Sequence, residues 1–396
     1  QEAVKFGNGP LLILAGAGAG KTKTIAYRIL HLINQGVEPS KILAITFTNK
    51  AAGEMRERVL GLLQNHLPPG ELVAPSQRPF ISTFHSLGVY LLREYASLVG
   101  LTKRFSIVDQ DDALGVIKKI LKDFELDPER FPPKKIHYII SQEKNRLNTP
   151  SRYQETAGPG PLPPVVTKIW QEYATRLQAQ GGVDFDDLLL KTNQLLGSQP
   201  EVLADCRARW QYLHIDEYQD TNHAQYRLAK MLVGPARHLC VVGDTDQAIY
   251  GWRGADFTNL LKFEEDYPEA KIVLLTENYR STKNILAAAN SIIEKNLVRH
   301  PKTLVTQNQS GEKISLITGL TETDEALAVA QQCAQLLKDG VASAEIAVLY
   351  RTNFQSRVLE EAMLKTGLPY KVVGTRFFER KEIKDLTAFL KLALNQ

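Results

Sequence analysis

The sequence has little cysteine, no long apolar run and no concentration of charge of one sign. Its three cysteines are far apart and lack the spacing of metal ligands, which argues against a disulfide framework and favours a reducing cytoplasm. No apolar run approaches the roughly 20 residues of a transmembrane helix, so we expect no membrane partner. The net charge is +4, with Lys and Arg scattered along the chain, which permits a polyanionic partner without indicating one.

The chain alternates short apolar runs with segments of helical periodicity, which predicts an α/β fold with a parallel sheet. Its length predicts roughly two to four domains. The predicted strands are residues 11–14, 41–46, 80–84, 212–215, 239–242, 272–275 and 345–350. Predicted helices follow several of them, at residues 24–33, 51–63, 86–98, 186–196 and 381–394, and a proline-rich exposed loop is predicted at 64–79. Between about residues 108 and 180 only helical patterns occur, at 111–124, 133–146 and 165–180, which indicates an all-helical insertion.

A glycine-rich stretch at residues 15–22 lies between the first predicted strand and the first predicted helix. That is the context of a phosphate-binding loop, in which backbone N–H groups and a helix N-terminus surround phosphate oxygens. Lys21 would reach the β- and γ-phosphates, and the Thr22 hydroxyl would ligate Mg²⁺. Ala15 stands where the strict pattern has glycine, so its backbone conformation must be an ordinary one. The predicted nucleotide-binding residues are Gly16, Gly18, Ala19, Gly20, Lys21, Thr22 and Lys23.

Two adjacent carboxylates, Asp216 and Glu217, directly follow a predicted strand. Such a pair at the end of a buried strand is costly unless a cation binds it. Mg²⁺ held by Thr22 and Asp216 would supply that charge, and Glu217 would then orient or deprotonate an attacking water as a general base. The alternative interpretation of the pair is an exposed acidic loop.

Further candidates follow the next two predicted strands. The neutral amide of Gln247 can hydrogen-bond both a γ-phosphate and the attacking water, and so can sense the phosphate. Arg280 is a candidate arginine finger for charge on the transferring phosphoryl group, and Tyr279 can stack on adenine. The alternatives are a surface glutamine and a salt-bridge partner for Arg280.

Aromatic and cationic side chains are interleaved with glycine at residues 250–254. Bases of single-stranded nucleic acid stack on such aromatics, at about 1–3 kcal/mol per base, although aromatic side chains in general belong to cores. Two other strand ends repeat this combination of aromatic and polar residues. The candidate nucleic-acid contacts at the three places are Thr46, Phe47, Asn49, Lys50, His85, Tyr250, Trp252 and Arg253.

Every polar cluster named above comes immediately after a predicted strand. In open parallel sheets, ligands bind at the carboxyl ends of the strands. We therefore expect all of these clusters to face one cleft.

The motifs, in this order, resemble those of the superfamily 1 DNA helicases of the UvrD/PcrA/Rep type. The matching segments are AGAGAGKT at 15–22, ITFTNKAAGEM at 45–55, STFHS at 82–86, IDEYQDTN at 215–222, VVGDTDQAIYGWRGAD at 241–256, ENYRS at 277–281 and VLYRTN at 348–353. The resemblance spans nearly the whole chain. It implies a motor that uses ATP and Mg²⁺ to move 3′ to 5′ along single-stranded DNA and to unwind the duplex at its junction with the single strand.

The resemblance also implies two RecA-like P-loop domains with ATP between them. Domain 1A would comprise residues 1–107 and 181–280, interrupted by the helical domain 1B at 108–180, and residues 281–396 would begin an incomplete domain 2A. By the same resemblance, the catalytic residues would be Lys21, Asp216, Glu217, Gln247 and Arg280. Thr22 and Asp216 would bind the metal ion, and Tyr279 would stack on the adenine. Arg351 and Asn353 join the DNA contacts on this ground alone.

The ends of the chain depart from the family pattern. Only Glu2 stands between Gln1 and Ala3, so we expect the family's adenine-reading glutamine to precede residue 1. The family's later motifs are also absent, and we expect an N-terminal piece of a motor that exposes apolar surface in domain 2A. Such a piece would bind nucleotide, hydrolyse ATP slowly and fail to unwind. The alternatives are the motor part of a helicase–nuclease and a non-unwinding DNA-binding module switched by ATP; protein partners are left open.

Overall fold

The computed structural model describes residues 1–65, 73–372 and 381–394. The chain divides into two compact units, Gln1–Gly311 and Glu312–Gln396, and each is described here by itself. The loop predicted at residues 64–79 lies partly outside the described residues. None of the described helices is both long and apolar enough to cross a lipid bilayer.

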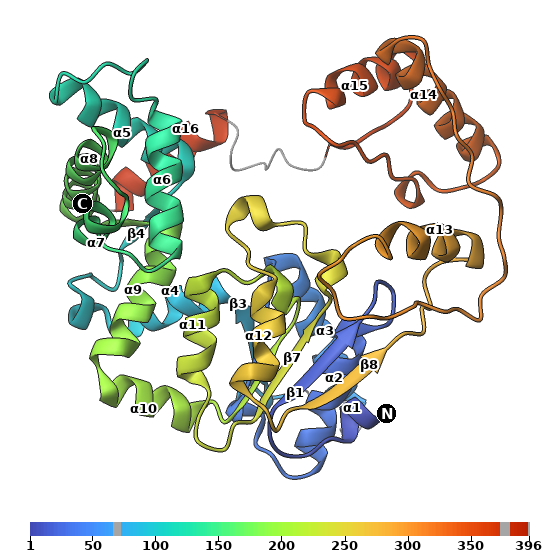
Figure 1. Cartoon of the computed structure of the whole chain (residues 1–396), viewed down its shortest axis with the longest axis horizontal. Coiled ribbons are helices and arrows are strands. Elements are labelled where there is room, and N and C mark those ends of the chain that lie inside the picture. The colour runs from blue at the N-terminus through green and yellow to red at the C-terminus, as the bar shows by residue number, and fades with distance from the viewer. Residues whose placement is uncertain (66–72, 373–380, 395–396) are drawn as a thin grey trace. The chain divides into compact units, whose positions relative to one another are not determined.

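The first unit is built on a six-stranded sheet in the order β3-β2-β6-β7-β1-β8, in which every pairing is parallel (Figure 1). β1 lies between two strands that come late in the sequence, with Leu11 opposite Cys240 on β7 and opposite Lys271 on β8. The predicted parallel α/β fold is therefore confirmed. The strands are β1 (Leu11–Ala15), β2 (Ile42–Thr46), β3 (Phe80–Thr83), β6 (Tyr212–Ile215), β7 (Leu239–Gly243) and β8 (Lys271–Leu275).

Both faces of the inner strands of this sheet are buried, and apolar residues fill those strands continuously rather than alternately, whereas the edge strand β8 is largely exposed. Successive side chains of β1 enter different cores: Leu12 and Leu14 belong to one, and Leu11 and Ile13 to the other. Each such buried Leu or Ile contributes about 1.5–3 kcal/mol. The second core is covered by α1 (Glu2–Lys5), α2 (Lys21–Asn34) and α3 (Asn49–Gln64); the first by α4 (Phe84–Glu94), α9 (Phe185–Ser198), α10 (Pro200–Arg209), α11 (His223–Leu232) and α12 (Thr258–Asp266).

The helices start at capping residues that stand at the strand ends. Thr48 accepts a hydrogen bond from the Ala51 amide at the start of α3, and Thr83 accepts one from the Ser86 amide at the start of α4. These helices therefore begin within a few residues of the strand ends. The 3₁₀ helices are Pro39–Lys41, Pro75–Gln77, Ala96–Val99, Tyr218–Asp220, Thr245–Gln247, Gly251–Arg253 and Ser343–Glu345.

The expected helical insertion is present and has its own core, which includes the buried rings of Trp170 and Tyr173. Its helices are α5 (Gln110–Asp123), α6 (Pro133–Asn145), α7 (Pro150–Thr156) and α8 (Leu162–Ala179). A parallel pair of short strands that the sequence pattern did not predict, β4 (Ser106–Val108) and β5 (Gly182–Asp184), brackets these helices. Beside β5 the buried ammonium of Lys144 lies 2.6 Å from Asp184 Oδ2 and 2.8 Å from Asp187 Oδ1.

Residues 276–311 complete the first unit. They include α13 (Lys283–Ile293) and a return of the chain to the end of β8, where Glu277 and Val305 form a parallel bridge. The amide of Asn278 donates to the Val305 carbonyl at 2.7 Å, and the amide of Val305 donates to the Thr276 carbonyl at 3.0 Å. The segment beyond α13 is thereby fixed to the edge of the sheet.

The second unit contains α14 (Glu322–Lys338), α15 (Gln355–Lys365) and α16 (Lys381–Leu394). α14 and α15 pack through small and flexible side chains, among them Ala330, Cys333 and Met363. The strand predicted at residues 345–350 was wrong: Ser343–Glu345 is a 3₁₀ helix, and among the described residues none pairs with 346–350 as a strand. An apolar run becomes a strand only where a neighbour accepts its backbone hydrogen bonds. Leu349 is accordingly 89% exposed.

Candidate active site

The loop between β1 and α2 has the geometry of a phosphate cradle. α2 begins at Lys21, and Gly20 before it has a left-handed backbone with φ of 83°. Ala15 is the last residue of β1 and is paired with Leu275, so its extended backbone does not require glycine, as expected. Gly16, Ala19 and Gly20 complete the loop, with the Ala19 amide donating to the Gly16 carbonyl. Lys23 is exposed on the first turn of α2.

Gly18 is required for space, and Gly16 is in close contact with a flexible side chain. Gly18 has a φ of 69°, and a Cβ there would lie 2.6 Å from Asn278 Nδ2 and 2.7 Å from Arg280 Cβ. A Cβ on Gly16 would lie 2.1 Å from Leu304 Cδ2. These glycines therefore let the loop lie directly beneath the chain that follows β8.

The side chain of Lys21 bonds to two other predicted residues. Its ammonium donates to Glu217 Oε2 at 2.5 Å and to Gln247 Oε1 at 3.0 Å, although about 200 residues separate these groups in sequence. The carboxyl ends of β1, β6 and β7 meet at one edge of the sheet, which is why the strand-end clusters converge as expected.

Thr22 and Asp216 are also brought together. The Thr22 hydroxyl donates to Asp216 Oδ2 at 3.1 Å, so two oxygen ligands of the type Mg²⁺ prefers lie side by side. Burial raises the pKa of Asp216 to about 6, and the neighbouring charge of Glu217 adds to the rise. A bound cation would oppose both effects. Within the described residues no group of three or more His, Cys, Asp or Glu side chains is placed to hold a metal ion.

Glu217 has a left-handed backbone, with φ of 51° and ψ of 47°. A non-glycine residue in this region is strained by roughly 1–3 kcal/mol and is held there by its surroundings. Its amide donates to Asp216 Oδ1 at 3.0 Å, and Gln219 Nε2 donates to its Oε2 at 2.8 Å. Gln219 is buried, and its Oε1 accepts from the Asp244 amide. Asp216 therefore holds the backbone of Glu217, and Gln219 holds its carboxylate.

Gln247 is fixed by a carboxylate. Its Nε2 donates to Asp244 Oδ2 at 2.6 Å, while its Oε1 accepts from Lys21. Because Asp244 can only accept, the amide must turn its carbonyl oxygen toward Lys21. Gln247 is half-buried and its side chain is bonded at both ends, which is more order than the alternative of a surface glutamine requires.

Tyr279 and Arg280 lie beside the phosphate loop. The Tyr279 amide donates to the Gly18 carbonyl at 3.1 Å, and its ring is 67% exposed, with the hydroxyl donating to Glu277. The Arg280 amide donates to Asn278 Oδ1. Its exposed guanidinium has no salt-bridge partner among the described residues, so the alternative role of Arg280 as an ion-pair residue is not supported.

The aromatic residues after β2 and β7 form a surface cluster. Phe47 and Tyr250 are in contact, with ring centroids 5.0 Å apart and ring planes tilted by 32°. Arg253 lies over the rings of Trp252 and Tyr250 at 4.5 and 5.6 Å. Trp252 is 66% exposed. The alternative that Trp252 belongs to a core is wrong, because a large aromatic surface with a guanidinium faces solvent here.

The other predicted nucleic-acid contacts in the first unit have different surroundings. Thr46 is buried, and its hydroxyl donates to the Thr48 carbonyl. Asn49 and Lys50 are exposed at the start of α3, and Asn49 Oδ1 accepts from Ser86. Burial lowers the pKa of His85 to about 4, so its ring is neutral at pH 7.

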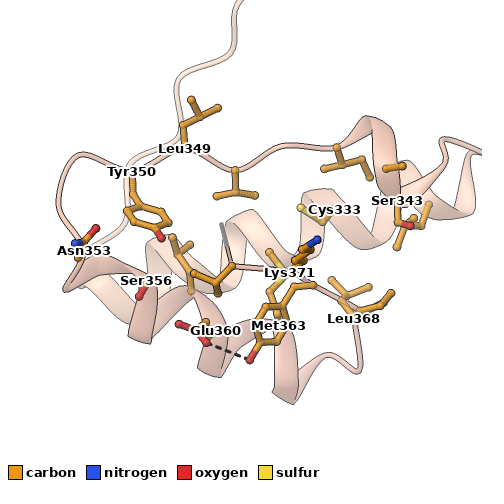
Figure 2. A pocket seen from close by; sticks show the side chains of 18 residues that line it. Cys333, Ser343, Leu349, Tyr350, Asn353, Ser356, Glu360, Met363, Leu368 and Lys371 are labelled. Atoms are coloured by element: carbon orange, nitrogen blue, oxygen red, sulfur yellow. Dashed lines mark hydrogen bonds between the residues drawn. The ribbon is translucent and has the colours of Figure 1, made fainter. Parts of the chain in front are cut away.

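Arg351 and Asn353 lie in the second unit, where both are exposed. Asn353 lines an apolar pocket of about 760 Å³ between α14, α15 and the unpaired chain at 346–350. Figure 2 shows Leu349, Tyr350 and Met363 at its walls, together with the hydrogen bond that Glu360 accepts from Tyr370. None of the predicted catalytic residues lines this pocket, so it is not the chemical site.

Some residues of the site were missed in the sequence. Gln219 and Asp244 bond to the predicted residues Glu217 and Gln247, and Lys302 bonds in turn to Asp244. The exposed ring of Phe185 lies 6.1 Å from that of His85. Gln219 and Asp244 stand inside the segments IDEYQDTN and GDTDQ and could have been found from that position. Lys302 gave no signal, because its partners are 56 and 58 residues away.

Comparison with known proteins gives matches over almost the whole chain. Residues 1–268 match the model of the UvrD/REP helicase N-terminal domain, and residues 273–396 match that of the UvrD-like helicase C-terminal domain. The chain is 50% identical over 398 residues to the ATP-dependent DNA helicase PcrA of Bacillus subtilis. It is 48% and 46% identical over 397 residues to the PcrA proteins of Staphylococcus epidermidis and Staphylococcus aureus. All of this chain is aligned in each case, but it spans only 52–53% of the relatives' length.

Proposed function

Because this chain belongs to the UvrD/REP helicase family, we propose that it is the ATP-hydrolysing part of a DNA helicase. The observation that carries the proposal is the convergence of Lys21, Thr22, Asp216, Glu217 and Gln247 through direct hydrogen bonds at one edge of the sheet. Each group has the chemistry that a phosphoryl-transfer site needs.

We propose that ATP binds with its phosphates in the loop of residues 15–22. The Lys21 ammonium would then exchange Glu217 and Gln247 for phosphate oxygens, since all three compete for the same donors. Backbone amides at the start of α2 add their partial positive charge. The exposed ring of Tyr279, beside this loop, is suited to stack on the adenine.

Hydrolysis would use groups that already lie around Lys21. Released from Lys21, Glu217 would accept a proton from the attacking water, and Gln247 would orient that water. Arg280 would neutralise charge on the phosphoryl oxygens, because its Cβ lies beside Gly18 and the residue is exposed, with no salt bridge among the described residues. Mg²⁺ held by Thr22 and Asp216 would supply charge neutralisation between the phosphates.

We propose that single-stranded DNA binds at the surface cluster of Phe47, Tyr250, Trp252 and Arg253. Stacked bases suit exposed rings, and the arginine suits the phosphate backbone. Such contacts tolerate any base sequence. Translocation from 3′ to 5′, preference for single-strand/duplex junctions and a cytoplasmic location are carried over from the family resemblance. The chain spans about half of its relatives' length, and we expect unwinding by these 396 residues alone to be weak.

The test is ATP hydrolysis with and without a single-stranded oligonucleotide at low salt, alongside nucleotide binding. Lys21→Ala should abolish both hydrolysis and binding, whereas Lys118→Ala, on the exposed face of α5, should change neither. Equal hydrolysis by the wild-type chain and Lys21→Ala, or no nucleotide binding by the wild-type chain, would overturn the proposal.

A further inference from the structure

Lys302 lies in the chain beyond α13, in a short stretch with no motif of its own, yet its ammonium is almost fully buried. Nζ lies 2.5 Å from Asp244 Oδ1 and 2.5 Å from Asp246 Oδ2, and the side chain is 3% exposed. Arg299 adds a fork to Asp246, with Nε at 3.0 Å and Nη2 at 2.8 Å. Two cations from one segment therefore neutralise two carboxylates of the loop after β7.

Asp244 is also the residue that orients Gln247. One of its oxygens binds Lys302, and the other accepts from Gln247 Nε2 at 2.6 Å. The hydrogen bonds thus run from Lys302 through Asp244 and Gln247 to Lys21. If Lys302 were removed, Asp244 would keep a buried negative charge without a cation beside it, and its carboxylate would rotate toward another donor.

The segment that carries Lys302 is itself held beside the phosphate loop. Leu304 packs against Gly16, and its backbone carbonyl accepts from Asn290 Nδ2 at 2.9 Å. Val305 is bonded on both sides to the chain of Thr276 and Asn278, two to four residues before Arg280. The position of Lys302 is therefore set by the same loop that carries the proposed arginine finger.

We propose that Lys302, assisted by Arg299, is a positioning residue that sets the orientation of Gln247 for ATP hydrolysis. This inference rests on the proposed function. Lys302 acts through Asp244, to which its ammonium is bonded. It links the phosphate-sensing amide after β7 to the chain that follows β8, so displacement of residues 299–305 would misalign Gln247.

The test is a double-mutant cycle on kcat in the full 396-residue chain. Lys302→Met should lower kcat by about 10–100-fold, the loss seen when an outer hydrogen-bond partner of a catalytic group is removed, with ATP affinity changed less than about threefold. In a Gln247→Ala background the same substitution should change kcat by less than twofold, because the residue it positions is gone. If the two substitutions lower kcat independently, so that their fold-changes multiply in the double variant, the proposal would be overturned.

Lys144→Met is the matched control for loss of a buried lysine between two carboxylates, because Lys144 lies in the helical insertion. It should lower stability comparably and leave kcat per folded molecule unchanged. If Lys302→Met does not fold, Asp244→Asn replaces it in the cycle, since it removes the shared acceptor charge with little change in volume. Full kcat in these variants, with wild-type hydrolysis dependent on Lys21, would refute this inference alone. Wild-type hydrolysis that survives Lys21→Ala would refute the proposed function as well.

Discussion

Lys21 and Glu217 form a direct ion pair, with Nζ 2.5 Å from Oε2, across the carboxyl ends of β1 and β6. The proposed phosphate ligand and the proposed general base therefore neutralise one another until a phosphate separates them. The carboxylate of Glu217 therefore already lies next to its proposed site of action before a phosphate binds. Removal of this carboxylate should therefore affect ATP binding and ATP hydrolysis differently.

Glu217→Gln should lower ATP hydrolysis by about 10²–10⁴-fold, because the amide cannot accept the proton of the attacking water. ATP affinity should stay the same or rise, since Lys21 loses a competing anion. Phosphate release and the fluorescence of a labelled nucleotide measure the two quantities. Glu269→Gln, an exposed glutamate paired with Arg237, is the control. Undiminished turnover in Glu217→Gln would contradict the assignment of the base. If ATP still changes DNA binding in this variant without being hydrolysed, the protein would act as an ATP switch rather than as a motor.

Gly18→Ala should abolish nucleotide binding. The new Cβ would meet Asn278 and Arg280 at less than 3 Å and would also be strained at a φ of 69°. Gly36→Ala is the control, because Gly36 has a φ of 92° but no atom within 4 Å of an added Cβ. It should cost only the backbone strain, about 1–2 kcal/mol, and keep wild-type affinity. Equal nucleotide affinity of the two variants, measured by titration, would contradict the crowding argument.

Trp252→Ala should weaken binding of single-stranded DNA by about 1–3 kcal/mol, measured by fluorescence anisotropy at low salt. Phe124→Ala removes another exposed aromatic, on the helical insertion, and should leave affinity unchanged. Arg253→Gln should in addition reduce the slope of log affinity against log salt by about one. Wild-type DNA affinity in Trp252→Ala would contradict the proposal that DNA binds at the surface cluster.

Stability should fall as the solution is acidified, partly because of His214. Burial lowers the pKa of His214 to about 3 from an ordinary 6.5, so the unfolded chain binds the proton more tightly than the folded chain. The contribution is complete above pH 6.5 and is lost as the pH falls toward 3. Between pH 7 and pH 5 the resulting loss in the free energy of unfolding is about 2 kcal/mol. Urea unfolding of wild type and of His214→Leu at a series of pH values should show a steeper decline of stability with acidification for wild type, and equal slopes would contradict the prediction.

The parts of the molecule that the sequence predicted well are those governed by local pattern. Strands such as Leu11–Ala15 are apolar, and the residues after them are polar because a parallel sheet binds ligands at that edge. The phosphate loop could be recognised because its glycines, strand and helix are adjacent in sequence.

The features that sequence did not predict depend on distant partners. β4 and β5 are three residues each and pair across the whole helical insertion. Residues 346–350 have a strand-like composition, but no described neighbour pairs with them. Lys302 looks like any surface lysine until the fold brings Asp244 beside it. Pairing across the chain, rather than composition, decides these cases.

The central position of β1 has a consequence for synthesis on the ribosome. Leu11 leaves the ribosome early, but its partner Cys240 follows 229 residues later, and Lys271 later still. At roughly 5–20 residues per second, the nascent chain carries this apolar segment without its neighbours for about 10–50 s. During that interval the segment is a target for chaperones and for other nascent chains. Among the six strands of this sheet, β1 is made before the others and is among the last to be placed. The loop of residues 15–22 attached to it can form only when most of this unit has been translated.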